Sequence, residues 1–168
     1  ANGRRPPPTP GALAVRALGP ARVRCVLDDI SWLWRVMLAG ERTSAYLSHL
    51  ATRDASKLEP GAALKALWLN DSGAVRGAGA IARYGKAMLL LVSAAEDREW
   101  IGSAAARFGV KMHEAGEGGL ALIGPYSARV LQEAGLDPAL EPLAVRKAFW
   151  RGLSVTISRF GEHGGYEI

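Results

Sequence analysis

The sequence predicts an α+β fold in which helices pack on a mostly antiparallel sheet. Segments typical of strands alternate with segments typical of helices, and two strand-like runs flank the turn sequence NDSG at residues 70–73. Such a turn joins neighbouring antiparallel strands, whereas a doubly wound parallel sheet needs a crossover helix between consecutive strands. Continuous apolar runs predict the remaining strands, and apolar residues at helical spacing predict the helices.

The chain has the size of a single domain. Of its 168 residues 49% are hydrophobic, which is enough for a sizeable core. Residues 1–15 are expected to form a flexible arm, because the segment ANGRRPPPTP is rich in proline and arginine and offers little apolar surface. Residues 16–168 are expected to form one domain, and no apolar run is long enough to predict a membrane span.

In the first part of the chain, dense apolar runs such as WLWRVML at residues 32–38 are typical of buried strands. Residues 94–108 carry apolar side chains at helical spacing and end before Gly109, which is typical of a helix end. Strands are expected over residues 21–27, 32–38, 63–69, 74–83 and 88–92, and helices over residues 41–51 and 94–108.

In the second part, Pro125 suits the first position of a helix and Gly135 closes it. Apolar and polar residues alternate over residues 153–160, which indicates a half-buried strand. Further expected elements are strands over residues 110–113 and 120–123, a helix over 125–134 and a short helix over 143–150.

Charge and reactive residues exclude several classes of function. A net charge of +5 favours anionic partners, although a basic surface without such a role fits equally. Because the arginines are scattered, no nucleic-acid partner is expected. The single cysteine, Cys25, excludes an internal disulfide, and the three histidines are widely spaced, so no metal site is expected. One cysteine also fits a reducing compartment, and the expected localisation is the cytoplasm.

The C-terminal stretch carries the features most suggestive of a ligand. It combines a glycine-rich segment with the residues Tyr166, Glu167 and Ile168. Glycines let the backbone approach a flat ligand, and an aromatic ring offers a stacking surface. A carboxylate accepts two parallel hydrogen bonds from an N–H/NH₂ edge, as on a pterin or a guanine. A surface turn with solvated carboxylates accounts for the same residues.

Five short motifs occur in a recognisable order along the chain. They are DIS at residues 29–31, VMLAGERTSA at 36–45, LATRD at 50–54 followed by LEPG at 58–61, LIGP at 122–125 and GYEI at 165–168. In this order they resemble the folate-binding domain of the glycine cleavage system T-protein, in the aminomethyltransferase family.

The resemblance implies a T-protein-like fold, tetrahydrofolate as cofactor and a folate site at the end of the chain. Glu167 corresponds to the glutamate that binds the amino edge of the pterin, and Gly165 precedes it in the same motif. In such a site Tyr166 and Phe160 are expected to form apolar walls, and Arg159 or Arg83 is expected to meet the glutamate tail of the folate.

The sequence also departs from the family pattern. Gly77 and Ala78 stand where the family has two aspartates, the second of which is associated with positioning the amine. The chain alone is therefore expected to be a poor aminomethyltransferase or none. No catalytic residue is assigned; Glu162 and His163, in an altered loop, are candidates for proton transfer. The alternative is a degenerate structural subunit that has lost folate chemistry.

Length gives one more expectation. A T-protein continues well beyond the GYEI motif, whereas this chain stops at Ile168. We therefore expect a partner polypeptide that supplies the C-terminal half, or a larger amine-oxidising or demethylating complex in which this chain takes part in one-carbon transfer.

Overall fold

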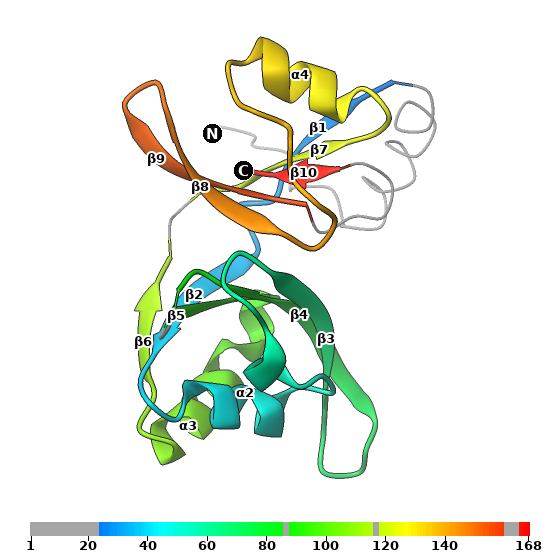
Figure 1. Cartoon of the computed structure of the whole chain (residues 1–168). Coiled ribbons are helices and arrows are strands. Elements are labelled where there is room, and N and C mark those ends of the chain that lie inside the picture. The colour runs from blue at the N-terminus through cyan, green and yellow to red at the C-terminus, as the bar shows by residue number, and fades with distance from the viewer. Residues whose placement is uncertain (1–23, 86–87, 116–117, 160–164) are drawn as a thin grey trace, which may run out of the picture.

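The computed structural model describes residues 24–85, 88–115, 118–159 and 165–168, and it contains two five-stranded sheets. The sheets lie one above the other, with helices on the outer side of each (Figure 1). Every pairing between the strands of the described residues is antiparallel, which confirms the expected α+β class. The expected arm over residues 1–15 lies outside the described residues, and no described helix is long and apolar enough to cross a membrane.

The lower sheet has the strand order β3-β4-β5-β2-β6, and its outer face carries two helices and two 3₁₀ turns. The strands are β2 (Trp34–Ala39), β3 (Ala63–Leu69), β4 (Val75–Arg83), β5 (Met88–Ser93) and β6 (Lys111–Glu114). The helical elements are α2 (Thr43–Leu50), η1 (Ala55–Lys57), η2 (Ala95–Asp97) and α3 (Arg98–Arg107).

The upper sheet has the strand order β1-β7-β10-β9-β8 and carries one helix. Its elements are β1 (Val26–Asp29), β7 (Leu120–Ile123), α4 (Ser127–Glu133), β8 (Val145–Trp150), β9 (Leu153–Ser158) and β10 (Tyr166–Glu167). The strands that the sequence predicts over residues 110–113 and 120–123 are present, but they belong to different sheets.

Two hydrophobic cores hold the helices against the sheets. Alternation along β2 turns Val36 and Leu38 toward α2 and α3, where they meet the fully buried Tyr46 and Trp68. In the upper layer Leu131 of α4 packs on the outer side of the sheet, in a cluster with Ile157 and Tyr166. The inner faces of the two sheets are therefore left to face one another.

The short helix expected over residues 143–150 is wrong. Residues 145–150 of this segment form β8, in which Val145 pairs with Ser158 and Trp150 with Leu153. Leu143 has a φ of 57°, which breaks any helix at this point, and its N–H donates to the carbonyl of Arg159. Pairing with β9 satisfies the backbone of this segment, so a distant contact overrides its local helical pattern.

Candidate functional site

Glu167 lies where the two sheets meet, and its side chain borders two cavities. The first cavity has a volume of about 550 Å³ and the second about 630 Å³. Tyr166 pairs with Leu122, and Glu167 pairs with Ser158 in β9. Because successive side chains of a strand point to opposite faces, Tyr166 enters the core under α4 and Glu167 is turned toward the lower sheet.

The first cavity has a largely apolar wall formed by β3 and β4. Leu67 pairs with Ala78, and Lys65 pairs with Ala80, on the face that points away from α2 and α3. The small side chains of β4 leave this space open. The cavity is lined by Leu33, Thr52, Arg53, Lys65, Ala66, Leu67, Ala78, Gly79, Ala80 and Glu167. The LATRD motif thus contributes two lining residues, and the departure from the family at Ala78 lies in the cavity itself.

Glu167 is a partly desolvated carboxylate beside two cations. Burial raises the pKa of Glu167, whereas Arg35 and Lys65 lower it. These cations come from β2 and β3 of the lower sheet, so the charge of Glu167 is balanced across the boundary between the sheets. A carboxylate held this way can accept hydrogen bonds from a ligand in an environment where few water molecules compete.

Arg35 is a site residue that the sequence did not reveal. Its guanidinium donates to the carbonyls of Leu33 at 3.0 Å and Ile30 at 3.2 Å. It lies against Gly119, where an added β-carbon would force the guanidinium to shift. Burial lowers the pKa of Arg35, and the nearby carboxylates Glu167 and Asp29 raise it. The only local signal was a single charged residue within the apolar run WLWRVML.

The structure does not bring all expected folate-site residues to Glu167. Tyr166 is buried under α4, and its hydroxyl donates to the carbonyl of Pro138 at 2.8 Å. Arg159 donates to the carbonyl of Leu140 at 2.8 Å, with its guanidinium 5.9 Å from the centre of the Tyr166 ring. Neither residue lines either cavity, so these positions do not support the expected wall and tail contacts.

The remaining expected residues divide into two groups. Gly165 precedes β10 where a β-carbon would lie 3.0 Å from the carbonyl oxygen of Leu122, so the small residue permits close strand pairing. Phe160, Glu162 and His163 lie outside the described residues, and their roles stay predictions. Among the described residues, no group of three or more histidine, cysteine, aspartate or glutamate side chains is placed to hold a metal ion.

Stability is expected to report the desolvation of Glu167. Because burial raises its pKa, the folded state holds this proton to a higher pH than the unfolded chain does. The protonated Glu167 carboxyl contributes fully to the unfolding free energy below the pKa of the unfolded chain. This contribution is lost as the pH rises through the pKa of the folded state. Glu167→Gln is therefore expected to raise the unfolding free energy at pH 7 and to flatten its decline above about pH 4.3.

Urea unfolding of wild type and Glu167→Gln between about pH 4 and pH 8 measures this effect. Glu141→Gln, which changes an exposed carboxylate, is the control and is expected to follow the wild-type profile. A Glu167→Gln protein that is less stable than wild type at pH 7 contradicts the prediction.

Comparison with known proteins places the chain among known folds and families. The family model for the GCVT N-terminal domain matches residues 16–168. A curated aminomethyltransferase from Frankia alni is 29% identical over 149 residues, which cover 83% of this chain and 40% of that protein. The aminomethyltransferase from Mycolicibacterium paratuberculosis is 30% identical over 150 residues, 84% of this chain and 41% of that protein. The chain thus spans about two fifths of these curated relatives' length.

The fold also occurs in solved structures of other proteins. The glycine cleavage system aminomethyltransferase T from Bartonella henselae superposes with a TM-score of 0.74 and 26% identity, over 88% of this chain and 42% of that chain. A chain of the heterotetrameric sarcosine oxidase from Corynebacterium sp. U-96 superposes with a TM-score of 0.58 and 19% identity, over 98% of this chain and 85% of that chain. At this identity the second match establishes the fold alone.

Proposed function

The chain belongs to the GCVT N-terminal domain family, and on this basis we propose that it is a tetrahydrofolate-binding subunit of a complex that transfers methyl or aminomethyl groups. The observation that carries the proposal is the position of Glu167, a partly buried carboxylate at the wall of an apolar cavity of about 550 Å³. This is the glutamate that the sequence resemblance singles out for the pterin.

The chemistry of the first cavity fits a reduced pterin. The pterin presents two neighbouring N–H donors, which a carboxylate such as Glu167 accepts side by side. Ala78, Gly79 and Ala80 have very small side chains, so a flat ring can lie close to the backbone of β4. Leu67 adds apolar surface beside it. Most ligand sites combine such apolar walls with a few polar groups that fix orientation.

A cation is available for the tail of the ligand. Arg53 lines the first cavity, and it replaces Arg159 as the candidate that meets the carboxylates of the folate tail, because Lys65 already offsets the charge of Glu167. Within this proposal Glu167 binds and orients the ring, the apolar wall excludes water, and Arg53 holds the tail. Tetrahydrofolate itself supplies the nitrogen that accepts the one-carbon unit.

The proposal assigns the transfer step to an assembly rather than to this chain alone. Ala78 places no carboxylate in the cavity where relatives in the family resemblance have an aspartate, and a methyl group neither binds an amine nor moves a proton. A partner polypeptide, or a larger oxidoreductase complex, would supply the missing group. The occurrence of this fold in a chain of a heterotetrameric enzyme supports that part of the proposal.

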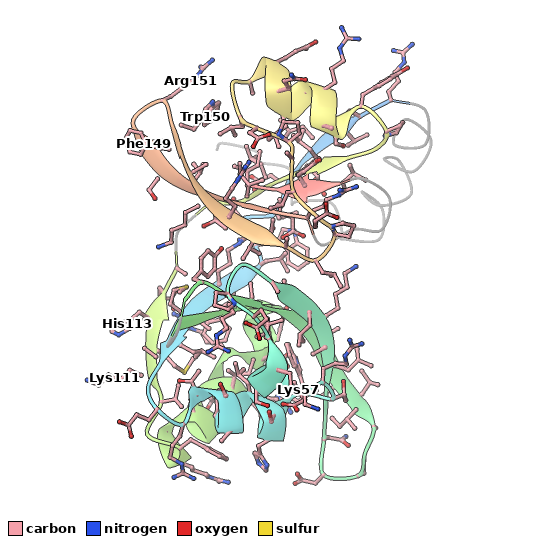
Figure 2. All side chains as sticks on the ribbon, in the orientation of Figure 1. Lys57, Lys111, His113, Phe149, Trp150 and Arg151 are labelled. Carbon is pink, nitrogen blue, oxygen red and sulfur yellow. The ribbon has the colours of Figure 1, made fainter. Side chains whose placement is uncertain are left out.

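A structural subunit without ligand is the second candidate. It is favoured by Ala78 and by the hairpin of β8 and β9, where Phe149 is 77% and Leu153 62% exposed. Figure 2 shows Phe149 and Arg151 at the end of this hairpin, whereas Trp150 packs on the upper core and donates to the carbonyl of Ala134 at 2.6 Å. Exposed aromatic and arginine side chains are typical of protein interfaces.

Calorimetric titration with tetrahydrofolate separates the two candidates. The chain, together with the partners that co-purify with it, is expected to bind the ligand, and Glu167→Ala is expected to weaken binding at least tenfold. That loss corresponds to about 1.4 kcal/mol, within the range for a hydrogen bond to a charged group. Glu141→Ala, at an exposed carboxylate, serves as the control. The absence of heat at millimolar tetrahydrofolate favours the structural subunit, and unchanged binding by Glu167→Ala refutes the assigned site.

A further inference from the structure

The second cavity lies between the inner faces of the two sheets and is separate from the apolar wall of the first. Its volume is about 630 Å³, and Glu167 is the one residue that both linings share. The lower sheet contributes Arg35 and Met37, with Tyr84 just beyond β4, and the upper sheet contributes the inner side of β8 and β9.

The upper wall of this cavity carries a row of hydroxyl groups. Ser154, Thr156 and Ser158 alternate along β9 and all line the cavity. Lys147 of β8 is directly opposite Thr156 in the register, so these two side chains are neighbours on the same face. An ammonium and several hydroxyls are thus gathered on one wall.

Lys147 is held over the cavity without a counterion in the described part of the chain. Its ammonium lies 5.7 Å from the centre of the Tyr84 ring, within the range of a cation–π contact. Two carboxylate side chains line the cavity, those of Asp29 and Glu167, and both interact electrostatically with Arg35. The charge of Lys147 therefore remains available to an anion from outside.

The lower wall adds apolar surface. Met37 and the ring of Tyr84 lie there, and burial raises the pKa of Tyr84, so the phenol stays neutral. Its hydroxyl is enclosed near Thr156 without a hydrogen bond of normal geometry among the described residues. On this side a ligand meets the apolar surface of Met37 and Tyr84 beside Arg35, whose charge Glu167 and Asp29 offset. On the other side it meets a cation with hydroxyl donors.

We propose that the second cavity is a binding site for a small carboxylate with an apolar body, distinct from the pterin site at Ala78. The carboxylate lies between the Lys147 ammonium and the hydroxyls of Thr156 and Ser154, and the apolar body lies on Met37 and Tyr84. A free aromatic or branched carboxylic acid and the carboxylate tail of a folate share this chemistry. The inference does not depend on the proposed folate function.

Isothermal titration with 2-naphthoate tests the site, with 2-naphthamide as a neutral ligand of the same shape. Wild-type protein is expected to bind naphthoate more tightly than naphthamide. Lys147→Gln is expected to weaken naphthoate binding about tenfold or more, since hydrogen bonds to charged groups contribute most to such affinities, and to leave naphthamide binding unchanged. Thr156→Val, which removes one hydroxyl at nearly constant shape, is expected to weaken naphthoate binding severalfold.

Lys111→Gln is the matched control, because Lys111 is an exposed lysine on β6, far from this cavity (Figure 2). Naphthoate binding that Lys147→Gln leaves intact, or no binding by wild type at millimolar naphthoate, overturns the proposal. Competition by tetrahydrofolate would identify the folate tail as an occupant, and its absence would identify an independent carboxylate; either result supports the site. Naphthoate binding without tetrahydrofolate binding would leave this site standing while the proposed function fails.

Discussion

Replacing Gly77 by alanine is expected to destabilise the protein by about 2–4 kcal/mol, the sum expected from overpacking a core and disrupting a buried hydrogen bond. A β-carbon at this position would lie 2.7 Å from the indole nitrogen of Trp68, and it would also collide with the carboxylate of Asp97. Trp68 is fully buried and donates to Asp97 at 2.9 Å. Asp97 also forms an ion pair with Arg76 at 3.4 Å, so the substitution disturbs a connected polar network.

Urea or thermal unfolding measures the loss, and Gly102→Ala is the matched control. Gly102 lies within α3 with no atom within 4 Å of an added β-carbon. Alanine in a helix interior is expected to stabilise the protein by about 0.5–1 kcal/mol. A Gly77→Ala protein as stable as wild type would show that the lower core relaxes far more easily than its packing indicates.

Filling the first cavity is expected to abolish tetrahydrofolate binding. In Ala78→Trp the indole occupies the space beside Glu167 into which Ala78 is exposed. We expect a loss of affinity of about a hundredfold or more, equivalent to about 2.7 kcal/mol, because a ring cannot share this space with the ligand. Calorimetric titration measures the change, and urea unfolding confirms that the variant is folded.

Ala74→Trp is the control for this experiment. Ala74 lies at the exposed end of the β3–β4 hairpin, outside the lining of the first cavity, so the same added bulk is expected to leave affinity unchanged. Wild-type affinity in Ala78→Trp would place the folate away from the first cavity and would contradict the role assigned to this wall.

Local chemistry explains why much of the fold could be predicted. Asn70 accepts hydrogen bonds from the backbone of Ser72 at 3.1 Å and Ala74 at 2.9 Å, and Gly73 takes a φ of 80°. These features lie within five consecutive residues, so the sequence predicts the β3–β4 hairpin directly. The helix over residues 98–107 could be predicted for the same reason, because the spacing of its own apolar side chains defines its buried face.

Residues 143–150 could not be predicted this way. Their backbone pairs with β9, and Val145 donates to the carbonyl of Gly61, more than eighty residues earlier in the chain. A short apolar run fits a helix or a strand, and only the partner strand decides between them. The sequence also did not show which side of the sheet Tyr166 occupies. The pairing of β10 with β7 and β9 turns Tyr166 into the upper core and Glu167 toward the cavity.

By itself, the sequence determined the α+β class, the family and the glutamate on which the proposed site depends, because the turn chemistry and the ordered motifs are local properties. Only the tertiary structure decided what surrounds Glu167. Arg35 and Lys65 come from β2 and β3, more than a hundred residues earlier in the chain, and they reach the carboxylate because the inner faces of the two sheets meet there. Desolvation and charge balance depend on distances in space, which the spacing of residues along a chain does not specify.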